Sequence, residues 1–432
     1  MNYKKKNYSF SLNQIENVFV TIGFLSFIFF WGLKINFDLR LFIVFPVFFF
    51  LCRFFKEKLD LRVFYFPLLV IGCVILHLSL SLIINKELFN DDFLSNYYRS
   101  ILPLFIVALA VSQYFKLLVK NFELIINIFI SLYLLEILII ILKTISLLNS
   151  DHNINLLKLI FNCDNGLTSY SGIVFHENSH LAMISVPLIF FKIIKNNLFK
   201  KKISLCIFII FIIFNYLSYS TTFHVGIIAS GLFSVIYLIF RREYKRLYLF
   251  LPIILFSILI IFFDKTCRLK LNHSTHLGQH VLFEKKNDLE NKPVNLTSEV
   301  HYYGLLVIKS SLKDTNFIGA GFNNYEILNK LYRDKFTKLF FYPGAVELNS
   351  KDASSNLIKI ISEFGLFVFF LVILFLYFIF KSTENLYISV FLISAIVTQL
   401  IRGAGYFNGG FILFALMICY SVFFRNKENK ND

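Results

Sequence analysis

Apolar segments long enough to cross a lipid bilayer recur along almost the whole chain of 432 residues. Backbone amide and carbonyl groups within a bilayer must find hydrogen-bond partners inside the protein, so such segments fold as helices. Charged residues make up only 16% of the chain, whereas a soluble globular domain carries roughly 25%. The sequence therefore predicts an all-α integral membrane protein.

The apolar segments predict about twelve transmembrane helices. A polar stretch, 264–356, interrupts them and is too long and too charged to lie within a bilayer. We therefore expect a single polytopic membrane domain, 1–432, in which this stretch forms one large extracytoplasmic loop between helices nine and ten. The predicted spans are 17–35, 40–55, 62–85, 100–117, 122–147, 180–197, 203–219, 224–241, 247–263, 357–381, 386–402 and 406–425.

The basic residues indicate the orientation of these spans. The net charge is +16, and Lys and Arg concentrate in alternate connecting segments, among them 4–6, 53–62, 192–202 and 241–246. Cytoplasmic loops of membrane proteins carry such an excess of basic residues. Both termini are therefore predicted to be cytoplasmic, with the large loop outside. No nucleic-acid-binding motif accompanies the basic clusters, so no nucleic-acid partner is expected.

Residues at the start of the sixth predicted span could carry chemistry. Glu177 and His180 lie three positions apart, so a helix that begins here places them on one face. A carboxylate beside an imidazole can supply a general base and the group that orients it. Helix capping explains the same residues, because Asn178 or Ser179 can accept hydrogen bonds from free amides of the first turn. From the residues alone, capping is the more frequent explanation.

Three histidines in the large loop have a spacing that could suit a metal ion. His273, His276 and His280 are three and four residues apart, which could place imidazoles on one helix face. Gly278 interrupts that helix, and no fourth ligand is evident. We therefore expect no metal site.

The segment SGIVFHENSHLAM, residues 171–183, resembles the Glu-Pro-Ser-His-x-Ala signature of Wzy-type O-antigen and capsule polymerases. Asn178 stands where proline is usual in that family. An arginine often precedes the signature, whereas this chain has Thr168, Ser169 and Tyr170 there. This departure argues against an arginine in this segment that grips the substrate.

Two later elements are similar to the wider O-antigen polymerase and ligase superfamily. Residues 312–325 resemble its "pl-G-x-G" element, in which Gly319 and Gly321 allow positive φ and close approach to a ligand, although a simple turn also explains them. Residues 354–366 resemble the superfamily's entry to the next span. Ligases typically have a histidine near the start of that entry, and two serines stand there instead, which favours a polymerase.

The resemblance implies a membrane glycosyltransferase that joins undecaprenyl-diphosphate-linked repeat units into O-antigen or capsular polysaccharide, at the outer face of the bacterial inner membrane. It implies neither a cofactor nor a metal. The implied partners are two lipid-linked glycans, the lipid bilayer, and the chain-length regulator and flippase of the same pathway. A sugar hydroxyl of the acceptor attacks the anomeric carbon of the donor, which requires a base and cations for the leaving diphosphate.

Candidates for these roles lie in the predicted outer segments. Arg268 and Arg333 are the only arginines of the large loop, and Arg402 ends the eleventh span. A guanidinium suits diphosphate oxygens, although snorkelling to lipid headgroups explains Arg402 as well. His301 could be a base or a proton-bearing phosphate partner, and an amphipathic loop helix explains it equally. The predicted catalytic residues are Glu177, His180 and His301; the predicted substrate-binding residues are Ser179, Arg268, Arg333, Arg402, Gly319 and Gly321.

Other functions stay open at this point. The closest alternative is an O-antigen ligase that transfers glycan to lipid A-core. A lipid-linked oligosaccharide flippase or transporter is the second, and a structural partner in an envelope assembly is the third. The sequence shows no internal repeat, and charges inside the spans are few, which counts against transport.

Overall fold

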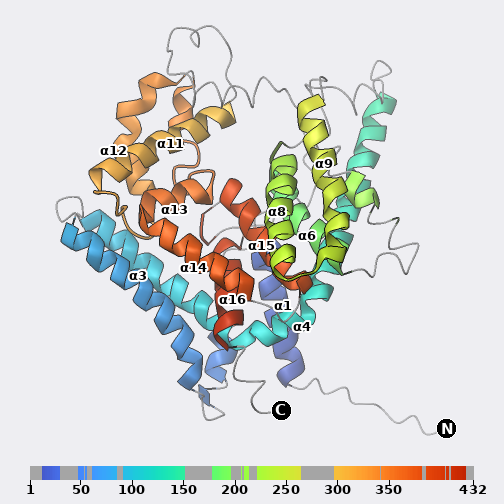
Figure 1. Ribbon diagram of the computed structural model, residues 1–432, viewed down its shortest axis with the longest axis horizontal. Coiled ribbons are helices and arrows are strands. Elements are labelled where there is room, and N and C mark those ends of the chain that lie inside the picture. The colour runs from blue at the N-terminus through green and yellow to red at the C-terminus, as the bar shows by residue number, and fades with distance from the viewer. Residues whose placement is uncertain are drawn as a thin grey trace.

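The computed structural model contains only helical regular structure in the part of the chain that it describes (Figure 1). The described residues are 12–29, 47–52, 54–55, 61–84, 91–150, 178–195, 206, 209–213, 221–263, 296–340, 342–381, 386–403, 405–407 and 410–424. The principal helices are α1 (Leu12–Phe29), α3 (Tyr65–Ile84), α4 (Asp91–Ser150), α6 (Asn178–Ile194), α8 (Thr221–Phe240), α9 (Leu247–Phe263), α11 (Leu296–Asp314), α12 (Tyr325–Phe336), α13 (Asn356–Phe364), α14 (Phe367–Lys381), α15 (Leu386–Ile401) and α16 (Phe411–Phe424). Short 3-10 helices are η2 (Leu61–Phe64), η5 (Tyr244–Arg246), η8 (Thr337–Leu339) and η9 (Pro343–Val346).

Helix α15 lies at the centre of the molecule. Its sequence, LYISVFLISAIVTQLI, is apolar on nearly every side, which is typical of a helix that is buried all round. Side chains from Ile388 to Gln399 are buried without a break. Helices α6 and α8 pack against α15, and α9 packs against α8 (Figure 1).

Three helical segments in the described chain are long and apolar enough to cross a membrane: Leu61–Ile84, Asp91–Leu135 and Phe223–Phe240. Five shorter apolar helices accompany them: Ile184–Ile194, Phe250–Leu259, Phe367–Phe380, Leu386–Ile401 and Phe411–Val422. Helix α3 also exposes large apolar side chains along its length, which suits contact with lipid rather than water. These helices are those of an α-helical membrane protein.

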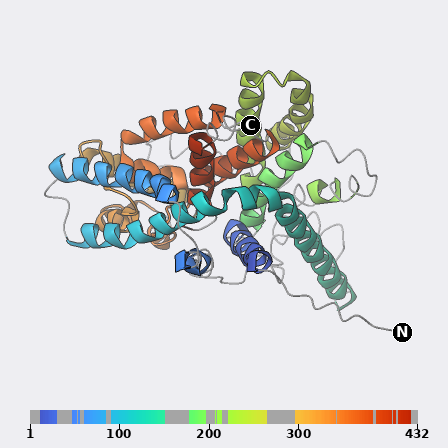
Figure 2. The ribbon, with the colours of Figure 1, turned by 90° about the horizontal axis from the view of Figure 1, so that it is seen from below.

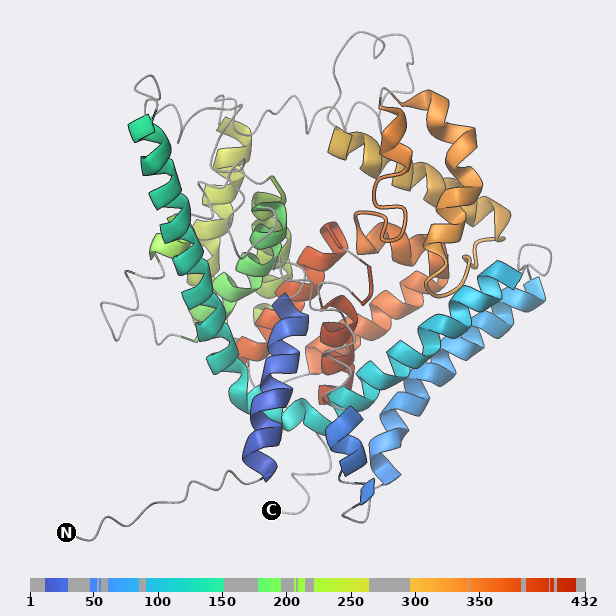
Figure 3. The ribbon, with the colours of Figure 1, turned by 180° about the vertical axis from the view of Figure 1, so that it is seen from behind.

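Helix α4 differs from the prediction. Spans 100–117 and 122–147 were expected to be separate helices, but the structure carries both in one helix of 60 residues. The reason is local: no Gly or Pro occurs between 104 and 150 to end the helix. Figure 3 shows α4 bent, with its two arms rising to the same side of the molecule. Figure 2 shows α3 beside the first arm, against which it packs.

The predicted span 357–381 also differs, because it is divided into α13 and α14. Gly365 follows α13 with φ +54°, a left-handed conformation that glycine adopts without steric cost. Its amide still donates to the carbonyl of Ile361 at 2.9 Å, after which the chain turns into α14. Helix α13 is therefore a separate short helix, and α14 supplies the apolar part.

The described part of the predicted large loop is helical and compact. Figure 1 shows α11 and α12 together at one end of the molecule, next to α13, and both helices contact α13. Helix α12 buries one face, formed by Tyr325, Leu328, Asn329, Tyr332 and Phe336. That spacing follows the helical period, so α12 is held by its own amphipathic face.

Candidate functional site

Helix α13 buries a polar face, which is unusual in an apolar surrounding. Asn356, Lys359, Ser362 and Glu363 recur at spacings of three and four, so they lie on one side of the helix, and all four are buried. Ser355 caps this helix, since its hydroxyl accepts from the amide of Ile358 at 3.4 Å. Buried polar groups require partners, and here the partners come from segments distant in the sequence.

Glu363 is fully buried and joins three segments of the chain. Its carboxylate accepts the amide of Asn323 at 2.8 Å, the amide of Tyr325 at 2.9 Å and the hydroxyl of Tyr406 at 2.6 Å. Tyr325 is the first residue of α12, so the carboxylate also faces the positive end of that helix. This single side chain thus holds α12 and the turn after α15 against α13.

Lys359 accompanies this carboxylate and is only 3% exposed. Its Nζ lies 3.9 Å from Glu363 and donates to the side-chain oxygen of Asn323 at 2.9 Å and to the carbonyl of Lys351 at 2.8 Å. It also lies 4.9 Å from the centre of the Tyr406 ring, a cation–π distance. A buried ion pair is tolerated only when its remaining donors and acceptors are satisfied, as they are here.

The two glycines of the "G-x-G" element pack on the end of α13. Gly319 and Gly321 have φ +88° and +89°, as the sequence predicted they could. The amide of Gly321 donates to the carbonyl of Glu363 at 2.8 Å. A Cβ on Gly319 would lie 2.4 Å from the same carbonyl oxygen. These glycines therefore let the turn approach another part of the backbone, and contact of either with a ligand stays a prediction.

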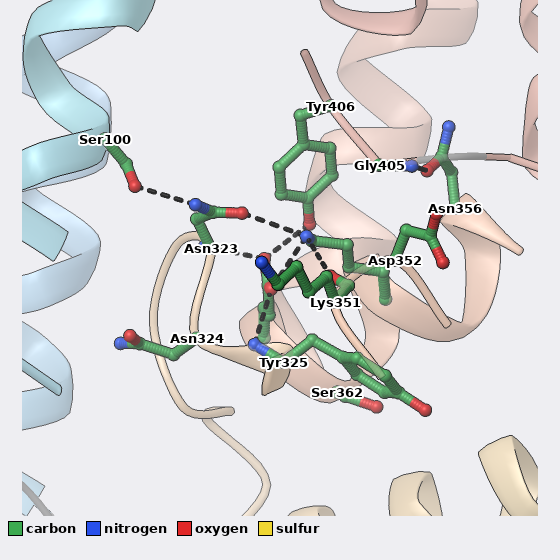
Figure 4. A network of polar contacts seen from close by, with 12 residues as sticks. Ser100, Asn323, Asn324, Tyr325, Lys351, Asp352, Asn356, Ser362, Gly405 and Tyr406 are labelled. Atoms are coloured by element: carbon green, nitrogen blue, oxygen red, sulfur yellow. Dashed lines mark hydrogen bonds and ion pairs between the residues drawn. The ribbon is translucent and has the colours of Figure 1, made fainter. Parts of the chain in front are cut away.

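The membrane helices anchor the same turn. The side-chain amide of Asn323 donates to Ser100 of α4 at 2.8 Å (Figure 4). Nε2 of His77, on α3, donates to the carbonyl of Ile318 at 3.1 Å. The polar network is therefore tied to α3 and α4 as well as to α13.

His301 and Arg402, two predicted site residues, lie close enough to interact electrostatically. Burial of His301, and then the positive charge of Arg402, lower the pKa of the imidazole to about 4. Its Nδ1 is buried and has no hydrogen-bond partner among the described residues. His301 is therefore neutral near pH 7, which favours an acceptor or orienting role over that of a proton-bearing phosphate partner.

Asp352 completes this group and was not singled out from the sequence. Burial raises the pKa of its carboxyl, and the Ser354 amide, Lys359 and Arg402 partly oppose that shift. The turn after α15 packs against it, since a Cβ on Gly405 would lie 3.5 Å from Cβ of Asp352 and 3.8 Å from Nζ of Lys359. The sequence signal that could have identified Asp352 is its position two residues before Ser354, where the 354–366 element begins.

An apolar cavity of about 250 Å³ adjoins the polar network. Apolar side chains of α3, α4, α13, α14, α15 and α16 line it, together with Phe322 and Tyr406. These two rings stack, with centroids 5.1 Å apart and planes within 9°. Because the hydroxyl of Tyr406 bonds Glu363 while its ring lines the cavity, one residue joins the polar and apolar halves.

Comparisons with known proteins give no relative. No protein family, no curated protein and no solved structure matches this chain. The resemblance to polysaccharide polymerases therefore rests on the sequence elements alone.

The other predicted site residues divide into two groups. Arg333, on α12, has its Nη1 3.5 Å from the carboxylate of Glu347, so the structure places it in a surface ion pair. Glu177 and Arg268 lie outside the described residues, as do the three histidines considered for zinc. Ser179 and His180 fall in the first turn of α6, which begins at Asn178, but their side chains are outside the description. Within the described chain, no group of three His, Cys, Asp or Glu could hold a metal.

Acid is expected to destabilise the wild-type protein more than a His301→Gln variant. The imidazole pKa is about 4 in the folded state, against an ordinary value of 6.5, so the unfolded chain takes up the proton first. The free energy of unfolding therefore falls as pH drops from 6.5 through 4. Unfolding midpoints of both proteins in detergent, at about pH 7 and about pH 5, measure the difference. An identical acid shift in the two proteins would contradict the burial of a neutral imidazole.

Proposed function

We propose that this chain is a membrane glycosyltransferase that polymerises undecaprenyl-diphosphate-linked repeat units into O-antigen or capsular polysaccharide. In this proposal the chain crosses the bacterial inner membrane about twelve times, with both termini cytoplasmic and residues 264–356 on the outer side. The observation that carries it is the junction of the polar group around Arg402 with the apolar cavity at Tyr406. A lipid-linked glycan also has a polar and an apolar part: a charged diphosphate that carries the sugars, and an isoprenoid tail.

The apolar cavity suits the part of the tail nearest the head. It opens among membrane helices, and its lining is almost wholly apolar, so burial of isoprene units there is favourable. The rest of a long tail would remain in the bilayer between α3, α14 and lipid. The exposed apolar side chains of both helices are consistent with that arrangement.

The polar half suits the diphosphate and the reacting sugar. Arg402 provides a guanidinium that can bind phosphate oxygens in pairs, and charge that develops on the leaving diphosphate strengthens that contact. Ser354 and Ser355, which stand where ligases typically have a histidine, have structural partners. The hydroxyl of Ser355 donates a hydrogen bond to the carbonyl of Leu400 at 2.7 Å. The hydroxyl of Ser354 accepts a hydrogen bond from the side-chain amide of Asn349. The absence of a histidine at these two positions favours a polymerase over a ligase.

Deletion of the gene is expected to collapse the surface-glycan length ladder to core plus one repeat unit. Loss of polymerisation still allows a single repeat to be made, exported and attached, so one band above the core should persist. Gel separation of the extracted glycan, beside the intact strain and a plasmid-complemented strain, measures this. Disappearance of the single-repeat band would indicate a ligase or a flippase, and an unchanged ladder would refute all three activities.

A further inference from the structure

We propose that Asp352 is the general base that accepts the proton of the acceptor hydroxyl, an inference that rests on the proposed function. Asp352 lies in the loop directly before α13, beside the turn that begins at Arg402. Figure 4 shows it at the edge of the buried network, with Asn356 and Gly405 close by. Unlike Glu363, it is partly exposed, so a substrate can reach it.

The hydrogen bonds of the two carboxylates separate their roles. Glu363 accepts three short hydrogen bonds and is fully buried, so a substrate cannot reach it. That is the environment of a structural carboxylate. Asp352 accepts the amide of Ser354 at 3.5 Å, the limit of a hydrogen bond. Its oxygens therefore retain capacity for a sugar hydroxyl.

The charges around Asp352 also suit a base. Burial favours its neutral form and raises its pKa, whereas Lys359 on α13 and Arg402 after α15 favour its ionised form. Because burial raises its pKa, this carboxylate is a stronger base than an exposed one, which suits proton abstraction from a hydroxyl. His301 also faces the cation Arg402, and burial together with that charge lowers its pKa to about 4, so it is a weaker base than an ordinary imidazole.

The transfer step balances without a further reactant. As the acceptor hydroxyl attacks the anomeric carbon of the donor, its proton moves to the carboxylate of Asp352. The new oxygen–carbon bond forms while the bond from that carbon to the diphosphate oxygen breaks, and the electron pair leaves on the diphosphate. Arg402 stabilises the departing charge, and Asp352 then releases the proton to water.

The test uses the full-length protein in lipid nanodiscs with lipid-linked repeat units extracted from the deletion strain. Asp352→Asn is expected to lower the turnover number roughly 10²- to 10⁴-fold, with a far smaller change in KM. The wild-type rate should fall on the acid side as the carboxylate takes up a proton, and Asp352→Glu should retain that acid limb at a reduced rate. Asp334→Asn, which removes an exposed carboxylate from α12, is the matched control and should match wild type.

The outcomes separate this inference from the proposed function. If the deletion strain loses its ladder but Asp352→Asn keeps wild-type turnover, the proposed function stands and the base is another residue. If Asp352→Asn is slow but has the same acid limb as wild type, Asp352 only positions other groups, and the inference is overturned. A deletion strain with an unchanged ladder would remove the proposed function and this inference together. Size-exclusion profiles of each variant show whether a slow variant is also folded.

Discussion

Replacement of Glu363 by Ala is expected to lower the free energy of unfolding by about 3–5 kcal/mol, the range for one partner lost from a buried ion pair. The change deprives Lys359, only 3% exposed, of the carboxylate that lies 3.9 Å from its Nζ. It also removes the acceptor for the amides of Asn323 and Tyr325 and for the hydroxyl of Tyr406. The amide of Tyr325 and the hydroxyl of Tyr406 would then be buried and unsatisfied, which adds to the loss.

Thermal or denaturant unfolding of the purified protein in detergent measures this effect. Glu347→Ala is the matched control, because Glu347 is a carboxylate of the same region whose side chain is 66% exposed, and its surface pair contributes about 0–1 kcal/mol. The double variant Lys359→Met/Glu363→Gln removes both charges and keeps one acceptor. We expect it to be more stable than the sum of its single changes predicts, since neither charge is left alone. Equal unfolding midpoints for Glu363→Ala and Glu347→Ala would contradict the network's role.

Replacement of Gly365 by Ala should lower the free energy of unfolding by about 3 kcal/mol or more. The residue has φ +54°, where a side chain is strained. Its new Cβ would lie 2.0 Å from the carbonyl oxygen of Phe317, a backbone atom that cannot rotate away. That carbonyl accepts the amide of Leu366 at 2.7 Å, so relief of the clash would break the contact between the 315–325 turn and α13.

A second glycine in the same region provides the comparison. A Cβ on Gly344, in η9, meets no atom within 4 Å, so Gly344→Ala should change the stability by no more than about 0.5 kcal/mol. Unfolding midpoints of the two variants, measured in one detergent, decide the prediction. A Gly365→Ala protein as stable as Gly344→Ala would show that the turn and α13 are not in contact in the folded protein.

The apolar runs alone predicted several helices closely. The predicted span 247–263 and α9 have the same bounds, and 224–241 and 386–402 match α8 and α15 within three residues. The length of an apolar run depends only on the local sequence, so it predicts these helix bounds without knowledge of the tertiary structure. The bent α4 and the break at Gly365 were missed for opposite reasons. A basic stretch without Gly or Pro can stay helical, whereas a single glycine inside an apolar run can end a helix.

The sequence by itself determined the class of protein, the polar insertion, and individual site candidates such as His301, Arg402 and the two glycines of the "G-x-G" element. Glu363 is one of the few charges inside the predicted apolar spans, but the sequence could not show which residues compensate its charge. The partners are Lys359 one turn away and segments about 40 residues to either side, which only the tertiary structure brings together. Burial converts these separate polar residues into one network, because each becomes costly without the others. Asp352 likewise became a candidate base only in the structure, because folding places Lys359 and Arg402 near its carboxylate.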